Sequence, residues 1–215
     1  MKNRVVITLV IITGIIGIAA SIGLFSHKYY QAQNLEQNLI QGLLWPDPKQ
    51  ITVFETIDNT NNRFGLEQLL GKWSFIFFGY THCPDVCPVT LSVLNSVYKD
   101  LQNKGKAEDL QTIFVSVDPE RDTPDQLDEY VRYFNPDFIG LGGTQDQVNS
   151  IIEQLGIAYF YGNKNDSGEY DVDHTASVFL IDPKGRLIGV FSSPQEKKDL
   201  INRFLAMQNF IEGQS

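Results

Sequence analysis

The chain has 215 residues, of which 42% are hydrophobic and 20% are charged. This ordinary globular composition excludes a wholly disordered chain and a fibrous repeat, and the length allows one domain with an appendage or at most two domains. Lys2 and Arg4 stand at the extreme N-terminus, so the remainder holds 15 basic and 26 acidic residues, a net charge of −11. A body this acidic lacks the basic surface that nucleic acids require, and no nucleic-acid partner is expected.

The first predicted element is a transmembrane helix over residues 5–25, which carry no charge. As an α-helix this segment is ~30 Å long, the thickness of a bilayer core. Residues 1–4 contain two basic side chains and are therefore expected in the cytoplasm, with everything after the helix on the far side of the membrane. The alternative is a cleaved signal peptide. Its apolar region would be shorter, and Ala19-Ala20-Ser21 is only a weak cleavage site.

The rest of the chain predicts one folded domain. Residues 26–48 are polar and loosely patterned and predict a linker, residues 49–211 predict the domain, and residues 212–215 form a C-terminal tail. Strand and helix patterns alternate within the domain, which indicates an α/β fold. Continuous apolar runs predict buried strands, and an apolar spacing of three and four predicts an amphipathic helix after Pro88. The predicted strands cover residues 73–80, 112–117, 177–181 and 186–191.

Three later helices are predicted from capping boxes that begin at Thr123, Thr144 and Ser193, each with Gln or Glu three residues further on. Gly156 is expected to end the second of these helices. Asp-Pro-Lys-Gly at 182–185 predicts a type I turn between the last two strands. An early strand–cysteine turn–helix unit and a late β-hairpin are typical of a thioredoxin-like fold, with a central mixed sheet flanked by helices.

Reactive chemistry is expected at Cys83 and Cys87, where a predicted strand ends and a helix begins. If residues 83–87 form the first helical turn, the two Cα atoms lie ~6 Å apart on one face, which permits a disulfide or a shared metal. The positive end of the helix favours thiolate over thiol. A purely structural disulfide is the alternative, but closing so short a loop contributes only ~2 kcal/mol.

A metal would need further ligands, and the chain has three histidines. His27 adjoins the apolar segment and is expected at a membrane interface, and the backbone should direct His82 away from its neighbour Cys83. His174 precedes the strand over 177–181, and in a thioredoxin-like layout this segment faces the cysteine turn. Two thiolates and one imidazole are a soft donor set that suits Cu(I), whereas a closed zinc site normally has a fourth protein ligand.

Three further segments near the candidate ligands have possible roles that the sequence supports less directly. Residues 118–124 predict a strand end followed by a capping box, and their charges either pair locally or contribute to a partner surface. Asp173 is a poor candidate for orienting His174, because adjacent side chains in an extended segment point to opposite faces. Residues 162–171 predict a long polar loop that could move when a metal binds.

Three motifs together resemble the Sco/SenC family of copper-binding cytochrome c oxidase assembly proteins. They are Gly79-Tyr-Thr-His-Cys-Pro-Asp-Val-Cys-Pro88, Val117-Asp-Pro-Glu-Arg-Asp-Thr-Pro124 and Val172-Asp-His174. They occur in the family's order and approximate spacing, and the resemblance covers about residues 45–211. It implies that Cys83, Cys87 and His174 are copper ligands and that the two cysteines also form a redox-active disulfide.

The resemblance further implies a membrane-anchored metallochaperone that delivers Cu(I) to the dinuclear copper centre of cytochrome c oxidase. Its partner would be the copper-accepting oxidase subunit. The protein would be a single-pass protein of the cytoplasmic (inner) membrane, with its domain on the periplasmic or extracytoplasmic side. Binding of Cu(II) stays open.

The alternative is a thiol–disulfide oxidoreductase that reduces the cysteines of the copper-accepting partner and is itself served by an upstream thiol reductant. Both functions use the same two sulfurs, but a dithiol reductant does not need His174. A dedicated enzyme is not expected beyond this thiol–disulfide reductase activity. A thiol peroxidase is disfavoured, because it needs one activated cysteine and not a tight pair.

Overall fold

The chain divides into two units, residues 1–41 and residues 42–215. Several predictions fall outside the residues that the structure describes. These are most of the transmembrane helix predicted over 5–25, most of the linker predicted over 26–48, and the last two residues of the tail. Among those described, no helix has the length and apolar character needed to cross a membrane. The computed structural model describes residues 17–18, 21–26, 41–44 and 46–213.

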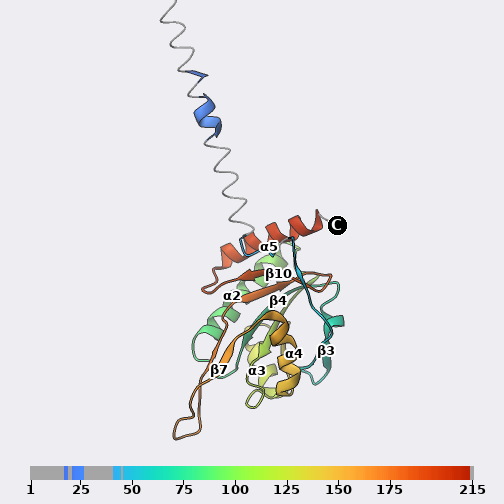
Figure 1. Cartoon of the computed structure of the whole chain (residues 1–215), viewed down its shortest axis with the longest axis vertical. Coiled ribbons are helices and arrows are strands. Elements are labelled where there is room, and N and C mark those ends of the chain that lie inside the picture. Colours follow the sequence, from blue (N-terminus) through green and yellow to red (C-terminus); the bar gives the residue numbers. More distant parts are fainter. Residues whose placement is uncertain (1–16, 19–20, 27–40, 45, 214–215) are drawn as a thin grey trace, which may run out of the picture. The chain divides into compact units, whose positions relative to one another are not determined.

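The second unit is built on an eight-stranded mixed sheet (Figure 1). Three central strands run parallel, and all other neighbours in the sheet are antiparallel. In spatial order the strands are β1 (Lys49–Gln50), β10 (Arg186–Phe191), β9 (Val178–Ile181), β4 (Trp73–Gly79), β5 (Leu110–Ser116), β6 (Ile139–Gly142), β2 (Glu55–Asp58) and β3 (Arg63–Gly65). The parallel strands are β4, β5 and β6.

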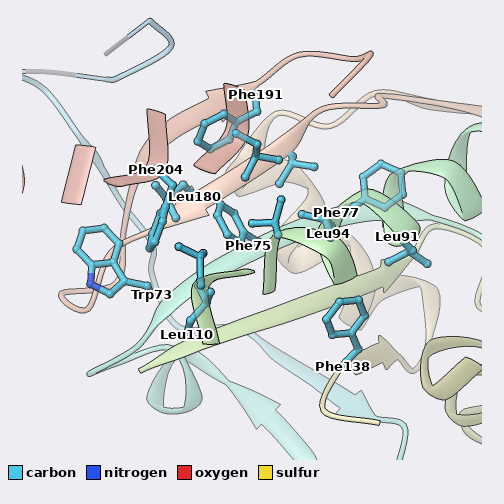
Figure 2. Packing of buried hydrophobic residues seen from close by; sticks show 14 of the residues in the cluster. Trp73, Phe75, Phe77, Leu91, Leu94, Leu110, Phe138, Leu180, Phe191 and Phe204 are labelled. Atoms are coloured by element: carbon cyan, nitrogen blue, oxygen red, sulfur yellow. The ribbon is translucent and has the colours of Figure 1, made fainter. Parts of the chain in front are cut away.

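Helices cover both faces of this sheet because alternate residues of its central strands point to opposite sides. On β4, Phe75 and Phe77 join a core that also contains residues of α2 (Val86–Asn103), α3 (Pro124–Phe134) and α5 (Lys197–Glu212). Figure 2 shows Phe75 among Leu180, Phe191 and Phe204 in this layer. On the other face, Ile76 and Phe78 pack in a core with residues of α4 (Gln145–Leu155). The predicted α/β fold with a helix-flanked mixed sheet is confirmed.

Most of the predicted element ends are confirmed by their capping geometry. The side chains of Thr123 and Thr144 accept hydrogen bonds from the backbone N–H groups three residues on, so both capping boxes form. Gly156 ends α4 with φ 68°, a left-handed conformation that costs glycine little. In the β9–β10 turn, the Gly185 N–H donates to the carbonyl of Asp182 at 2.9 Å.

The capping box predicted at Ser193 is wrong. α5 begins at Lys197, its N-cap is Glu196, and no side chain caps it. The Gln195 side-chain amide instead donates to the carbonyl oxygens of Ala176 at 2.8 Å and Phe191 at 3.2 Å. Gln195 therefore ties the segment before α5 to the residue stretch just before β9 and to the end of β10, and this segment does not start the helix.

No residue range was predicted for the short strands. Besides β1, β2 and β3, these are β7 (Tyr159–Tyr161) and β8 (Val172–His174), which pair with each other in a separate two-stranded sheet. The polar loop predicted over 162–171 connects this hairpin. Leu43 also forms an isolated bridge with Gly189, so the chain lies against the outer side of β10 before β1 begins.

The order of strands brings three chain segments to one edge of the sheet. Because β4 and β5 are parallel, both end at this edge, with Gly79 paired to Ser116, and the loops that follow emerge side by side. β9 is antiparallel to β4, so the residues that precede its first residue, Val178, lie at the same edge. The cysteine turn, the loop before α3 and the segment with His174 therefore converge.

Gly79 is the residue that allows the first turn of α2 to approach β4. A Cβ at this position would lie 2.5 Å from Cys87 Sγ and 2.8 Å from the ring of Phe114. We expect Gly79→Ala to lower the free energy of unfolding by ~1–3 kcal/mol, because the overpacked core has to shift. Urea denaturation measures this, with Gly213→Ala at the end of α5 as the control. Equal stability of the two variants would contradict the packing argument.

Candidate metal centre

Cys83 lies on the turn that leads into α2, and Cys87 is the second residue of that helix. The expectation that residues 83–87 form a helical turn is wrong, because α2 begins at Val86. The physical reason is Pro84, whose ring disfavours the α conformation at the preceding Cys83. Cys83 is held instead by a hydrogen bond from its N–H to the carbonyl of Tyr80 at 3.1 Å. Its thiol is half-buried, whereas Cys87, in the first turn of α2, is fully buried.

His174 approaches the cysteines from the β7–β8 hairpin. Its Nε2 atom lies 3.3 Å from Cys87 Sγ, and its Nδ1 atom lies 3.2 Å from the carbonyl oxygen of Thr175. A carbonyl only accepts hydrogen bonds, so we assign the proton to Nδ1, which leaves the lone pair of Nε2 directed at the sulfur. Asp173 is exposed on the other face of β8, as its place in an extended segment predicted.

The three side chains together form a set of donors with room for one ion. Cys83 Sγ, Cys87 Sγ and a ring nitrogen of His174 all lie within 4.8 Å of one another. Sulfur and imidazole donors that bind a common ion at ~2.0–2.3 Å are less than ~4.6 Å apart. Small side-chain adjustments therefore bring all three donors within bonding distance of one ion. Two sulfurs and one nitrogen are soft donors and fit Cu(I). The structure therefore brings together the three residues that the sequence singled out.

The two thiols share a proton unequally. The hydrogen bond from Cys87 lowers the pKa of Cys83 to about 4, although burial opposes this. The same hydrogen bond, together with burial, raises the pKa of Cys87 above its ordinary value. Cys83 is thus the thiolate at neutral pH. Cys87 keeps its proton until a soft metal ion binds the sulfur and displaces that proton.

His82 lies outside the donor set, as predicted. Its Nδ1 atom is 3.1 Å from Thr81 Oγ1 and 3.8 Å from Asp122 Oδ1, and the side chain is half exposed. His27 lies outside the described residues. Two aromatic rings lie beside the His174 imidazole. The ring centroids of Phe77 and Tyr80 are each 6.1 Å from the imidazole centroid.

The loop before α3 pairs its charges locally, which is one of the two interpretations that the sequence allowed. Arg121 forms an ion pair with Asp118, whose side chain is fully buried. Asp122 is 2% exposed and accepts hydrogen bonds from Thr81 and Ser116. The sequence assigned Asp122 only to a capping segment. No local pattern marks this role, because Asp122 lies six residues after β5 ends at Ser116.

The chain matches a known protein family. A sequence profile of the family described as SCO1/SenC matches residues 46–208, which is most of the chain. The human protein described as "Protein SCO1 homolog, mitochondrial" is 34% identical over 192 residues, a match that covers 88% of this chain and 62% of the human one. The human relative is thus substantially longer than the part that this chain matches.

Solved structures of similar proteins share the fold. ScoI of Arabidopsis thaliana, determined with copper bound, is 31% identical with a TM-score of 0.69, and the match covers 74% of this chain and 98% of that one. Apo Sco1 of Thermus thermophilus is 38% identical with a TM-score of 0.67, over 80% of this chain and 96% of that one. The thioredoxin-like fold inferred from the sequence agrees with both.

The unequal thiols make a prediction for alkylation of the reduced, metal-free protein. Because the Cys83 pKa is about 4, we expect iodoacetamide to modify Cys83 at a rate that is nearly constant from pH 6 to pH 9 and falls only as pH approaches that pKa. Cys87 is buried and protonated and should stay unmodified. Mass spectrometry of peptides after timed quenching measures both rates.

The control is Cys87→Ala, which removes the hydrogen-bond donor that stabilises the Cys83 thiolate. In this variant the alkylation rate of Cys83 should rise about tenfold per pH unit up to the ordinary thiol pKa of ~8.5. The same flat profile in both proteins would contradict the assigned cause.

Proposed function

Because the chain belongs to the SCO1/SenC family, we propose that it is a copper-binding protein that assists assembly of the dinuclear copper centre of cytochrome c oxidase. The observation that carries the proposal is the convergence of Cys83, Cys87 and His174 within 4.8 Å. The copper-bound structure of a family member that is 31% identical supports copper as the metal. The copper-accepting subunit of the oxidase would be the partner.

The chemistry of the site favours Cu(I) as the cargo. Thiolate and imidazole donors are soft and match a monovalent copper ion, which accepts three ligands. A closed structural zinc site normally has four protein ligands, and among the described residues only these three form a metal-ligand group. A site with three ligands also leaves one side open to an incoming donor. Cys83 and His174 are both half-buried, so an accepting protein can reach either of them before the fully buried Cys87.

A thiol–disulfide reductase is the second candidate, and the unequal cysteines favour it. The Cys83 thiolate would attack one sulfur of a partner disulfide, forming a mixed disulfide and releasing a partner thiolate. Cys87 would then lose its proton and attack Cys83 Sγ, which releases the second partner thiol and leaves a Cys83–Cys87 disulfide. The partner gains two electrons and this pair loses two. An upstream thiol reductant would restore the pair.

We also propose that residues 5–25 anchor the protein in the cytoplasmic (inner) membrane. The support is the uncharged sequence of these residues, preceded by Lys2 and Arg4. The domain would then lie on the periplasmic or extracytoplasmic side, in a compartment where the cysteines meet oxidants.

Removal of single ligands tests the copper site. The reduced wild-type protein should bind one Cu(I), with sulfur neighbours in X-ray absorption spectra. Cys83→Ser and Cys87→Ser should abolish tight binding, since the remaining donors hold Cu(I) poorly. His174→Ala should weaken binding but leave disulfide formation nearly intact, which separates copper binding from thiol chemistry. Titration of Cu(I) against a competing chelator measures each affinity.

The matched control is His82→Ala, a neighbouring histidine outside the donor set. It should bind Cu(I) as the wild type does. A spectrum with only oxygen and nitrogen neighbours, or a His174→Ala variant with wild-type affinity, would remove the basis of the copper site.

Reporter fusions test the membrane orientation. A C-terminal alkaline phosphatase fusion should be active, because that enzyme needs an oxidising compartment, and a C-terminal reporter that works only in the cytoplasm should be silent. Replacing Lys2 and Arg4 by Glu should reduce the phosphatase signal. The opposite reporter pattern would refute the orientation.

A further inference from the structure

We propose that the loop over residues 118–122, called the 118–122 loop, positions both halves of the metal centre without contributing a ligand. Asp122 holds the turn that carries the cysteines, and Arg121 holds the hairpin that carries His174. The proposal rests on the proposed copper site, and it assigns positioning residues to that site.

The first half of the proposal is the contact between Asp122 and the cysteine turn. Its Oδ2 atom accepts a hydrogen bond from the Thr81 N–H at 3.0 Å, and its Oδ1 atom accepts one from the Thr81 hydroxyl at 2.6 Å. Thr81 lies only two residues before Cys83. The Asp122 side chain is fully buried, so these bonds are shielded from competing water. Asp122 therefore fixes the backbone from which Cys83 projects.

The second half is the contact between Arg121 and the β7–β8 hairpin. The guanidinium stacks on the ring of Tyr170, 3.6 Å from its centroid, and Nη1 donates to the carbonyl oxygen of Tyr170 at 2.9 Å. The Tyr170 hydroxyl donates to Asp118 Oδ1 at 2.9 Å, and Asp118 also forms the ion pair with Arg121. Tyr170 lies four residues before His174, in the loop just before β8. Arg121 thus fixes the strand that carries the histidine.

The hydroxyl of Ser116, the last residue of β5, connects both contacts to that strand. Ser116 Oγ donates to Asp122 Oδ2 at 2.6 Å and accepts a hydrogen bond from the Asp118 N–H at 3.0 Å. The Arg121 and Asp122 N–H groups both donate to the carbonyl of Asp118, at 3.1 Å and 3.0 Å. The 118–122 loop is therefore a compact turn. Its position relative to β5 sets where both ligand-bearing segments lie.

A second contact also fastens the hairpin beside the same strand. The Tyr161 hydroxyl donates its proton to the carbonyl oxygen of Val117 at 2.8 Å, and Gln145 Oε1 lies 3.0 Å from the same hydroxyl oxygen. The hairpin is thus held at the end of β7 through Tyr161 and just before β8 through Tyr170. Loss of Arg121 should free the β8 side and leave the β7 side attached, so the expected change is a displaced histidine in a folded domain.

The experiment compares variants of the full-length protein in detergent. Arg121→Ala removes the stacking and the ion pair. Arg121→Lys keeps the charge beside the buried Asp118 but cannot stack and donate in two directions at once, and it guards against a failure of Arg121→Ala to fold. Arg132→Lys is the matched control, since Arg132 forms an exposed ion pair with Asp128 on α3. Asp122→Asn tests the cysteine half.

Three readouts are measured on each variant. Cu(I) affinity comes from competition with a chelator, the reduction potential of the Cys83–Cys87 pair from equilibration with dithiothreitol, and hairpin opening from hydrogen exchange of the reduced, metal-free protein. We expect both Arg121 variants to weaken Cu(I) binding by about 10–100-fold, as changes to groups that orient metal ligands do. They should also speed exchange of the Gly162 and Thr175 amides and leave the reduction potential unchanged.

A double-mutant cycle separates positioning from general destabilisation. In the His174→Ala background, Arg121→Lys should change Cu(I) affinity by less than about twofold, because the ligand that it positions is already absent. Asp122→Asn should still weaken binding in that background and should make the disulfide easier to reduce, because the cysteine turn is less constrained. Arg132→Lys should match the wild type in every readout.

The inference is overturned if folded Arg121→Lys binds Cu(I) as the wild type does, or if it weakens binding equally with and without His174. A failure of the proposed function looks different. In that case His174→Ala itself would bind Cu(I) as the wild type does. The hydrogen exchange of the metal-free hairpin would then still report whether Arg121 holds it, and unchanged exchange in both Arg121 variants would overturn the positioning role.

Discussion

The fully buried Asp122 carboxylate is the interaction on which the arrangement of the site depends. Burial raises the pKa of this carboxyl, and hydrogen bonds from Ser116 and Thr81 oppose that rise. A buried carboxylate is tolerated only when its oxygens are hydrogen-bonded, so the donors around it cannot move independently. Those donors belong to the ends of β5 and β4. The Asp122 carboxylate therefore fixes the turn that follows β4 relative to the end of β5, the strand that runs parallel to β4.

The main elements of the fold could be predicted because their signals are periodic and local. A run of seven buried residues makes β4, and two hydroxyl–glutamine pairs start α3 and α4. The short strands β1, β2, β3, β7 and β8 have two to four residues, too few for a period to stand out. The box at Ser193 failed for a different reason, because the Gln195 side chain bonds to the carbonyl of Ala176, 19 residues away, which no local pattern reveals.

The ligand residues could be predicted from their chemistry, but their arrangement could not. Cysteine and histidine are rare in this chain, so few candidates existed. The approach of His174 to within 3.3 Å of Cys87 depends on β9 running antiparallel to β4, which is a property of the whole sheet. The inequality of the two thiols is likewise tertiary. It follows from the hydrogen bond between the two thiols and from the burial of Cys87, for whose sulfur Gly79 leaves space.

The short outermost strands also affect how copies of the protein meet. An edge strand presents unpaired backbone groups to which another chain can add, and proteins limit this with short or covered edges. On one side β1 pairs with only two residues of β10, and Leu43 and Leu44 cover the next two positions, Gly189 and Ile188. On the other side β3 has only three residues. Neither border offers a long template for β-augmentation, so the sheet resists edge-to-edge aggregation even when the domain is concentrated.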